Sequence, residues 1–171
     1  MNNSEKEMSV FKHYCKRLQI EIINEHKEDD YWYLTLKTGD GTILLLEKKR
    51  ELDHCLLFYT VKYTDPKLIE QIEKVDLDPQ FIYGIKSAIF DPEVTMVFIP
   101  ENGHLRGYHL SRRLFPHEST FSVRDFDNAV RALSAVGGRG LAFINSVLGH
   151  QQVIQKSGED FPKTSPDGMF Y

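Results

Sequence analysis

The sequence predicts an α+β domain in which N-terminal and C-terminal helices cover an antiparallel sheet of about five strands. In the middle of the chain, β-branched and aromatic residues alternate with period two, which is typical of strands. Toward both ends, apolar residues recur at the three- and four-residue spacing of helices. The strands and helices do not alternate strictly, as they would in a parallel sheet. The expected order of elements is α-β-β-β-α-β-β-α.

Composition indicates a single core, because 171 residues with 41% hydrophobic content are enough to build one. We expect residues 1–149 to form one domain. Residues 150–171 are rich in Ser, Pro, Gly and charge, which predicts a C-terminal tail. The last four residues, GMFY, are apolar, so a contact of the tail with the body or with a second chain stays open.

The chain begins with a predicted helix and continues into strands. Ser4 and Glu7 have the spacing of a capping box, and an apolar stripe follows from Phe11 to Leu18. The helix is therefore expected to bury one face. Three or four antiparallel strands should come next, joined in part by the turn-forming residues KTGDGT. Their expected ranges are 20–26, 31–37, 42–49 and 54–63.

Two Asp-Pro pairs predict helix starts in the next part of the chain. Asp65 and Asp78 stand at cap positions, and each is followed by a proline that tolerates the first helical turn. A β-hairpin should follow, with strands at residues 94–99 and 104–115 and a tight turn at PENG. The hairpin completes the predicted sheet.

The last element is predicted to be one long helix over about residues 122–148. Its apolar positions keep helical phase across the GGRG segment, where a loop would reset the phase. Each glycine inside a helix costs about 1 kcal/mol relative to alanine, so close packing at Gly137 is expected to offset that cost. The alternative is two helices joined at residues 138–140, since glycine often ends a helix.

Several functional classes have no support in the sequence. A net charge of −4 and a pI near 6 argue against nucleic acid as a partner. Cys15 and Cys55 are too few for a disulfide framework, and the histidines lack metal-ligand spacing. There is no phosphate-binding loop, and no apolar run is long enough for a signal peptide or a membrane span. We therefore expect a cytoplasmic protein with no metal and no cofactor.

One segment, GYHLSRRLFPHES at residues 107–119, concentrates polar side chains. Strand alternation places His109, Ser111 and Arg113 on one face, while Tyr108 and Leu110 suit the core. A serine nucleophile needs a base within hydrogen-bond reach, whereas residues two apart on a strand lie about 7 Å apart. The segment also lacks the G-x-S-x-G elbow of many hydrolases. The three residues therefore favour a face that contacts a partner, with a hydrolase or small-ligand protein as the alternative.

Arginine is concentrated in the same part of the chain. Six of the eight arginines lie between residues 106 and 139, where lysine is absent. Arginine suits paired recognition of carboxylates and phosphates. A charged, solvated surface is the other interpretation, because charged residues are ordinarily exposed.

The order of elements resembles that of the type III secretion chaperone-like fold. Over residues 95–136, and above all in LSRRLFPHESTFSVRDFDNAVRAL, the sequence is similar to a small family of uncharacterised archaeal proteins with that fold. The resemblance carries no signature of catalytic residues. It implies a protein-binding or chaperone-like module that acts as a homodimer and holds an extended peptide. The expected contact is the helix at 122–148 or an exposed sheet edge.

Overall fold

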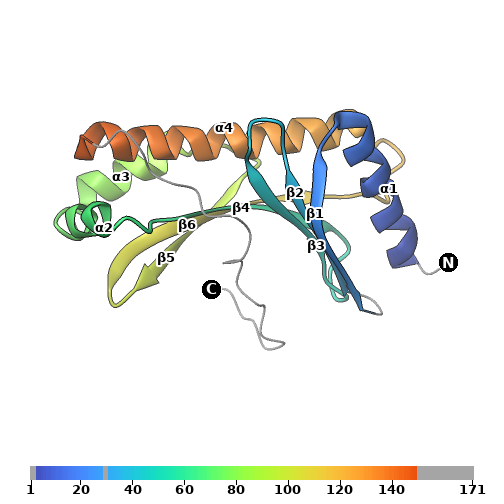
Figure 1. Cartoon of the computed structure of the whole chain (residues 1–171), viewed down its shortest axis with the longest axis horizontal. Coiled ribbons are helices and arrows are strands. Elements are labelled where there is room, and N and C mark those ends of the chain that lie inside the picture. The colour runs from blue at the N-terminus through green and yellow to red at the C-terminus, as the bar shows by residue number, and fades with distance from the viewer. Residues whose placement is uncertain (1–2, 29–30, 150–171) are drawn as a thin grey trace.

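A computed structural model describes residues 3–28 and 31–149 (Figure 1). The predicted tail at 150–171 lies outside the described residues. The helices are α1 (Asn3–Leu18), α2 (Pro66–Glu73), α3 (Pro79–Ala88) and α4 (Val123–Leu148). The strands are β1 (Glu21–Glu28), β2 (Tyr31–Lys37), β3 (Ile43–Lys48), β4 (Cys55–Lys62), β5 (Thr95–Glu101) and β6 (His104–Leu114).

The strands form one sheet in the order β1-β2-β3-β4-β6-β5, and all neighbouring strands are antiparallel. The predicted α+β class is confirmed. The sheet has six strands where about five were expected, because the first run contains four. The middle helical segment is divided into α2 and α3 by the second Asp-Pro pair. Since β6 pairs with both β4 and β5, it lies inside the sheet.

The turns and helix starts follow from the residues that occupy them. The β5–β6 turn has positive φ at both Asn102 and Gly103, which matches the twist of a two-residue hairpin. Side chains cap the middle helices: Asp65 accepts the Lys67 N–H at 2.9 Å, and Asp78 accepts the Gln80 N–H at 2.8 Å. These caps were predicted from the two Asp-Pro pairs.

The described helices pack on one face of the sheet (Figure 1). In α1, the ring of Phe11 contacts Trp32 of β2, with ring centroids 5.8 Å apart. In α4, the backbone approaches Tyr59, and the Gly137 carbonyl accepts the Tyr108 O–H at 3.0 Å. Burial of the phenol raises the pKa of Tyr59 to about 12, so its hydroxyl stays protonated at neutral pH. The core lies between these helices and the sheet.

Helix α4 is continuous from Val123 to Leu148, as predicted, and the alternative of two helices is wrong. A Cβ added at Gly137 would lie 2.8 Å from Cδ1 and 2.9 Å from Cζ of Tyr59, and closer still to Cε1. At Gly140 it would lie 2.6 Å from Cγ2 of Ile89. The helix therefore reaches the sheet only because these positions lack side chains. No helix in the described ranges is long and apolar enough to cross a membrane.

The start of α1 differs from the prediction. Helix α1 already includes Asn3, so Ser4 does not occupy the cap position of a Ser4–Glu7 capping box. The Glu7 carboxylate is buried and lies 2.7 Å from Nε2 of His117, in the segment between β6 and α4. A tertiary ion pair has replaced the local cap.

Candidate functional site

One face of the sheet has no described helix packed on it, and we call this the open face. In β4 every second residue is buried under the helices, and the residues between them are half-buried. In β6, Tyr108, Leu110 and Leu114 are buried on the same side, whereas His109 and Ser111 are half-buried and Arg113 is exposed. Strand pairing places Leu45, Phe58 and Ser111 in one row across the open face, with Thr60 and His109 beside it. The centre of the open face is thus apolar, and hydroxyl and imidazole groups adjoin it.

His109 is half-buried on the open face. Its Nδ1 lies 2.8 Å from Oγ1 of Thr60, its cross-strand neighbour on β4, and the two atoms form a hydrogen bond. Burial lowers the pKa of His109, because desolvation disfavours the imidazolium. The ring is therefore neutral at pH 7.

The structure places His109, Ser111 and Arg113 on the same face, as the alternation predicts. Tyr108, Leu110 and Leu114 are buried on the other face. No hydrogen bond joins Ser111 to His109 in the described part of the chain, and Nδ1 of the imidazole is bonded to Thr60. The arrangement consequently lacks the nucleophile–base contact that a serine hydrolase requires.

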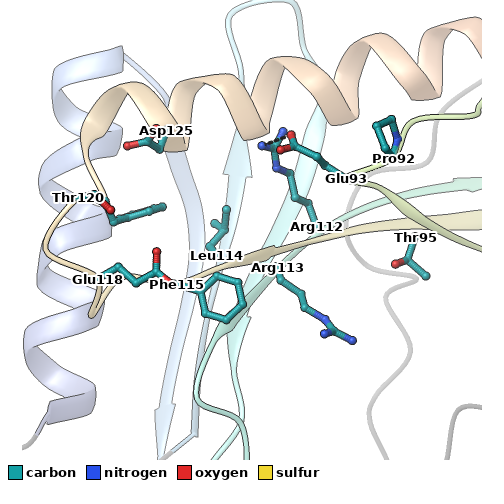
Figure 2. Close-up of a pocket in the computed structure, with 11 residues that line it drawn as sticks. Pro92, Glu93, Thr95, Arg112, Arg113, Leu114, Phe115, Glu118, Thr120 and Asp125 are labelled. Atoms are coloured by element: carbon teal, nitrogen blue, oxygen red, sulfur yellow. Dashed lines mark ion pairs between the residues drawn. The ribbon is translucent and has the colours of Figure 1, made fainter.

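A pocket of about 500 Å³ lies where β5 begins and β6 ends (Figure 2). Arg112 and Arg113 point to opposite sides of β6 in this view, and Arg112 reaches toward Glu93. The walls come from the turn before β5, the end of β6 and the segment leading into α4. The lining residues are Pro92, Glu93, Thr95, Arg112, Arg113, Leu114, Phe115, Glu118, Thr120, Phe121 and Asp125.

Three lining groups are already engaged in local structure. Arg112 forms an ion pair with Glu93. Asp125 accepts the Ser122 N–H at 2.8 Å and the Ser122 hydroxyl at 2.6 Å, which lowers the pKa of this carboxyl. Arg113 is exposed, and among the described residues it has no ion pair. Arg113 is the cation in this pocket that is available to a ligand.

Most of the clustered arginines stabilise the fold. Arg106 pairs with Glu73 of α2, and Arg131 lies 2.9 Å from Asp127 within α4. Arg139, in the middle of GGRG, donates to the carbonyl oxygens of Ala88 at 3.0 Å and Phe90 at 3.3 Å. It thereby binds free carbonyls at the end of α3. The sequence indicated neither these contacts nor their partners.

Two histidine contacts also hold elements together. Buried Asp76, between α2 and α3, accepts the Leu105 N–H at 2.7 Å and lies 3.2 Å from Nδ1 of His104. His117 pairs with buried Glu7 and so joins the segment before α4 to α1. Across the described residues there is no group of three side chains suited to bind a metal ion.

An exposed apolar set was missed by the sequence reasoning. Leu77, Tyr83 and Phe90, at and around α3, are each about three-quarters exposed, at 75%, 73% and 74%. The sequence contains a pattern that could have indicated the exposure of Tyr83. Phe81, Ile85 and Ile89 have helical spacing and form the buried stripe, which leaves Tyr83 on the outer side of α3.

The fold recurs in a solved structure of an archaeal protein. An uncharacterized protein from Methanothermobacter thermautotrophicus superposes with a TM-score of 0.71 at 10% identity, over 84% of this chain and 99% of that one. YbjN from E. coli matches with a TM-score of 0.49 at 11% identity, over 82% of this chain and 93% of that one. No protein-family model and no curated protein matches the sequence. The archaeal protein shows that the chain shares its fold.

Proposed function

We propose that the protein is a chaperone-like binding module that acts as a homodimer and holds an extended protein segment on the open face. The observation that carries this proposal is a sheet face with no described helix on it, on which half-buried Phe58 and buried Leu45 form an apolar centre. Such a face matches the alternating side chains of an extended peptide. His109 and Thr60 add polar groups that fix the orientation of a bound segment.

The homodimer is inferred from the resemblance in element order to type III secretion chaperones and from the exposed apolar residues around α3. Large apolar side chains gathered on a surface often mark a protein interface. The glycine-bearing face of α4 is excluded as the contact at Gly137 and Gly140, because these residues pack on the sheet. Light scattering at micromolar concentration tests the homodimer: it should give twice the chain mass, and a monomer would contradict it.

Binding on the open face is tested with reduced, carboxymethylated lactalbumin, a permanently unfolded protein, as the labelled probe. Fluorescence anisotropy should show saturable binding. Phe58→Lys should weaken it at least tenfold, because the substitution places a charge at the apolar centre of the face. The control is Asn128→Lys, which introduces the same side chain at an exposed position of α4, away from the open face and from the apolar residues around α3. Binding that survives Phe58→Lys unchanged would contradict the open face as the site.

A further inference from the structure

Strand β6 extends past the end of its neighbour β5. The β5–β6 pairing begins with Thr95 opposite Ser111, so Arg112, Arg113 and Leu114 pair with β4 alone. Within the described part of the chain, no backbone hydrogen bond connects these residues to a segment outside the sheet. Successive residues of a strand direct their N–H and C=O groups to alternate sides. At least one of the three residues therefore presents both groups to the side where β5 is missing.

The turn before β5 explains why β5 does not extend along that side of β6. The side chain of Asp91 accepts the Glu93 N–H at 3.0 Å, and its carbonyl accepts the Val94 N–H at 3.2 Å. Pro92 lies inside this turn and has no N–H to offer a strand. The chain consequently joins the sheet only at Thr95, and the pocket of about 500 Å³ occupies the place of the missing strand residues.

We propose that an extended segment of a partner protein adds to the sheet here as a short strand beside Arg112–Leu114 and places an acidic side chain next to Arg113. The inference rests on the proposed function as a protein-binding module, and it specifies where the main chain of the partner binds and what side chains it carries.

The main-chain groups of β6 determine the class of occupant. An unpaired strand edge offers N–H donors and C=O acceptors at the spacing of a polypeptide backbone, which is why exposed edges take up added strands. The pocket volume lies within the range of ligand pockets, about 300–1,000 Å³. A segment of a few residues completes the backbone pairing of β6 at this position.

Strand register determines the side chains of that segment. A residue opposite Arg113 projects onto the open face, beside the exposed guanidinium, where a carboxylate forms an ion pair. A residue opposite Leu114 projects to the helix side, toward Leu114 and Phe121. There an apolar side chain is favoured. The partner motif is thus an acidic residue directly adjacent to an apolar residue in an extended segment.

The test uses a random twelve-residue peptide library, displayed on phage and selected against the full chain. Enriched peptides should share an acidic residue adjacent to an apolar one. The best peptide, synthesised with a fluorescent label, should lose at least tenfold in affinity against Arg113→Glu. The same peptide with lysine in place of its acidic residue should bind Arg113→Glu more tightly than it binds the wild type.

Two further measurements separate strand addition from simple charge attraction. Methylation of the peptide nitrogens next to the acidic residue, which removes main-chain donors, should weaken binding at least tenfold. The matched charge reversal Lys67→Glu, at an exposed position in α2 that does not line the pocket, should leave the affinity unchanged.

The outcomes distinguish this proposal from the proposed function. Failure to enrich any peptide overturns strand addition at this edge, and so does binding that is insensitive to both Arg113→Glu and N-methylation. If the enriched peptides are insensitive to those changes but are lost with Phe58→Lys, the open face binds the segment and the edge does not.

Discussion

Alanine substitutions at the glycines of α4 test how this helix packs on the sheet. Gly137 and Gly138 are adjacent helical residues, so replacing either with alanine removes the same backbone entropy from the unfolded chain. That change alone stabilises a helix by about 0.5–1 kcal/mol. At Gly138 a new Cβ meets nothing within 4 Å. Gly138→Ala should therefore raise the free energy of unfolding by about that amount.

At Gly137 the new Cβ would overlap the ring of Tyr59, a core residue that is only 3% exposed. Overpacking of a core costs about 1–3 kcal/mol. Because the backbone contribution is the same at both positions, the difference between the two variants isolates the packing cost. We expect Gly137→Ala to be less stable than Gly138→Ala by about 1–3 kcal/mol.

Urea unfolding followed by circular dichroism measures this difference, provided that both variants keep the wild-type m-value. For a chain of this size each kcal/mol corresponds to about 2–4 °C in Tm. Combining Gly137→Ala with Tyr59→Leu, which shortens the ring side chain, should recover part of the loss. If the two alanine variants gain stability equally, the close approach of α4 to β4 described above is incorrect.

Three other substitutions test contacts on which the fold depends. His117→Ala leaves the buried carboxylate of Glu7 unpaired and should destabilise the protein by about 2 kcal/mol in urea unfolding, and adding Glu7→Gln should restore part of that stability. Arg139→Ala removes the donors to the carbonyls at the end of α3 and should cost about 1 kcal/mol, measured in the same way; an unchanged midpoint would argue against this cap. Because the folded-state pKa of His109 is lowered, the unfolded chain binds more protons just below pH 6.5, so stability falls as pH falls through that window. Replacing His109 with Asn should flatten the pH dependence between pH 7 and 5, and identical profiles would exclude His109 as a source.

Features set by local pattern were predictable from the sequence. Alternation assigned His109, Ser111 and Arg113 to one face because the side-chain period of a strand is fixed by its backbone. The unbroken apolar phase across Gly137 predicted a single helix, because a loop would have shifted the positions that follow it. These predictions depend only on the local sequence and not on which helices and strands pack against one another.

Contacts between distant segments were not predictable in this way. Arg139 and Ala88 are 51 residues apart, and nothing in either segment indicates the other. Ser4 and Glu7 had the spacing of a cap, but the carboxylate found a partner in a loop that only the tertiary fold brings near. The pocket beside β6 depends on where β5 begins, and the Asp91-Pro92 turn was the one local signal for that boundary.

The position of α1 has a consequence for the order of folding. Its Phe11 contacts Phe126 in the first turns of α4, with ring centroids 5.3 Å apart, so the first and last helices share one aromatic cluster. At the centre of the sheet, β4 pairs with β6, although α2, α3 and β5 separate these two strands in the sequence. Loop closure over such separations slows folding. During synthesis, α1 and β4 therefore cannot complete their packing until the C-terminal residues that contact them have been made. For α1 these residues lie in α4, so its packing is completed only after α4 has left the ribosome.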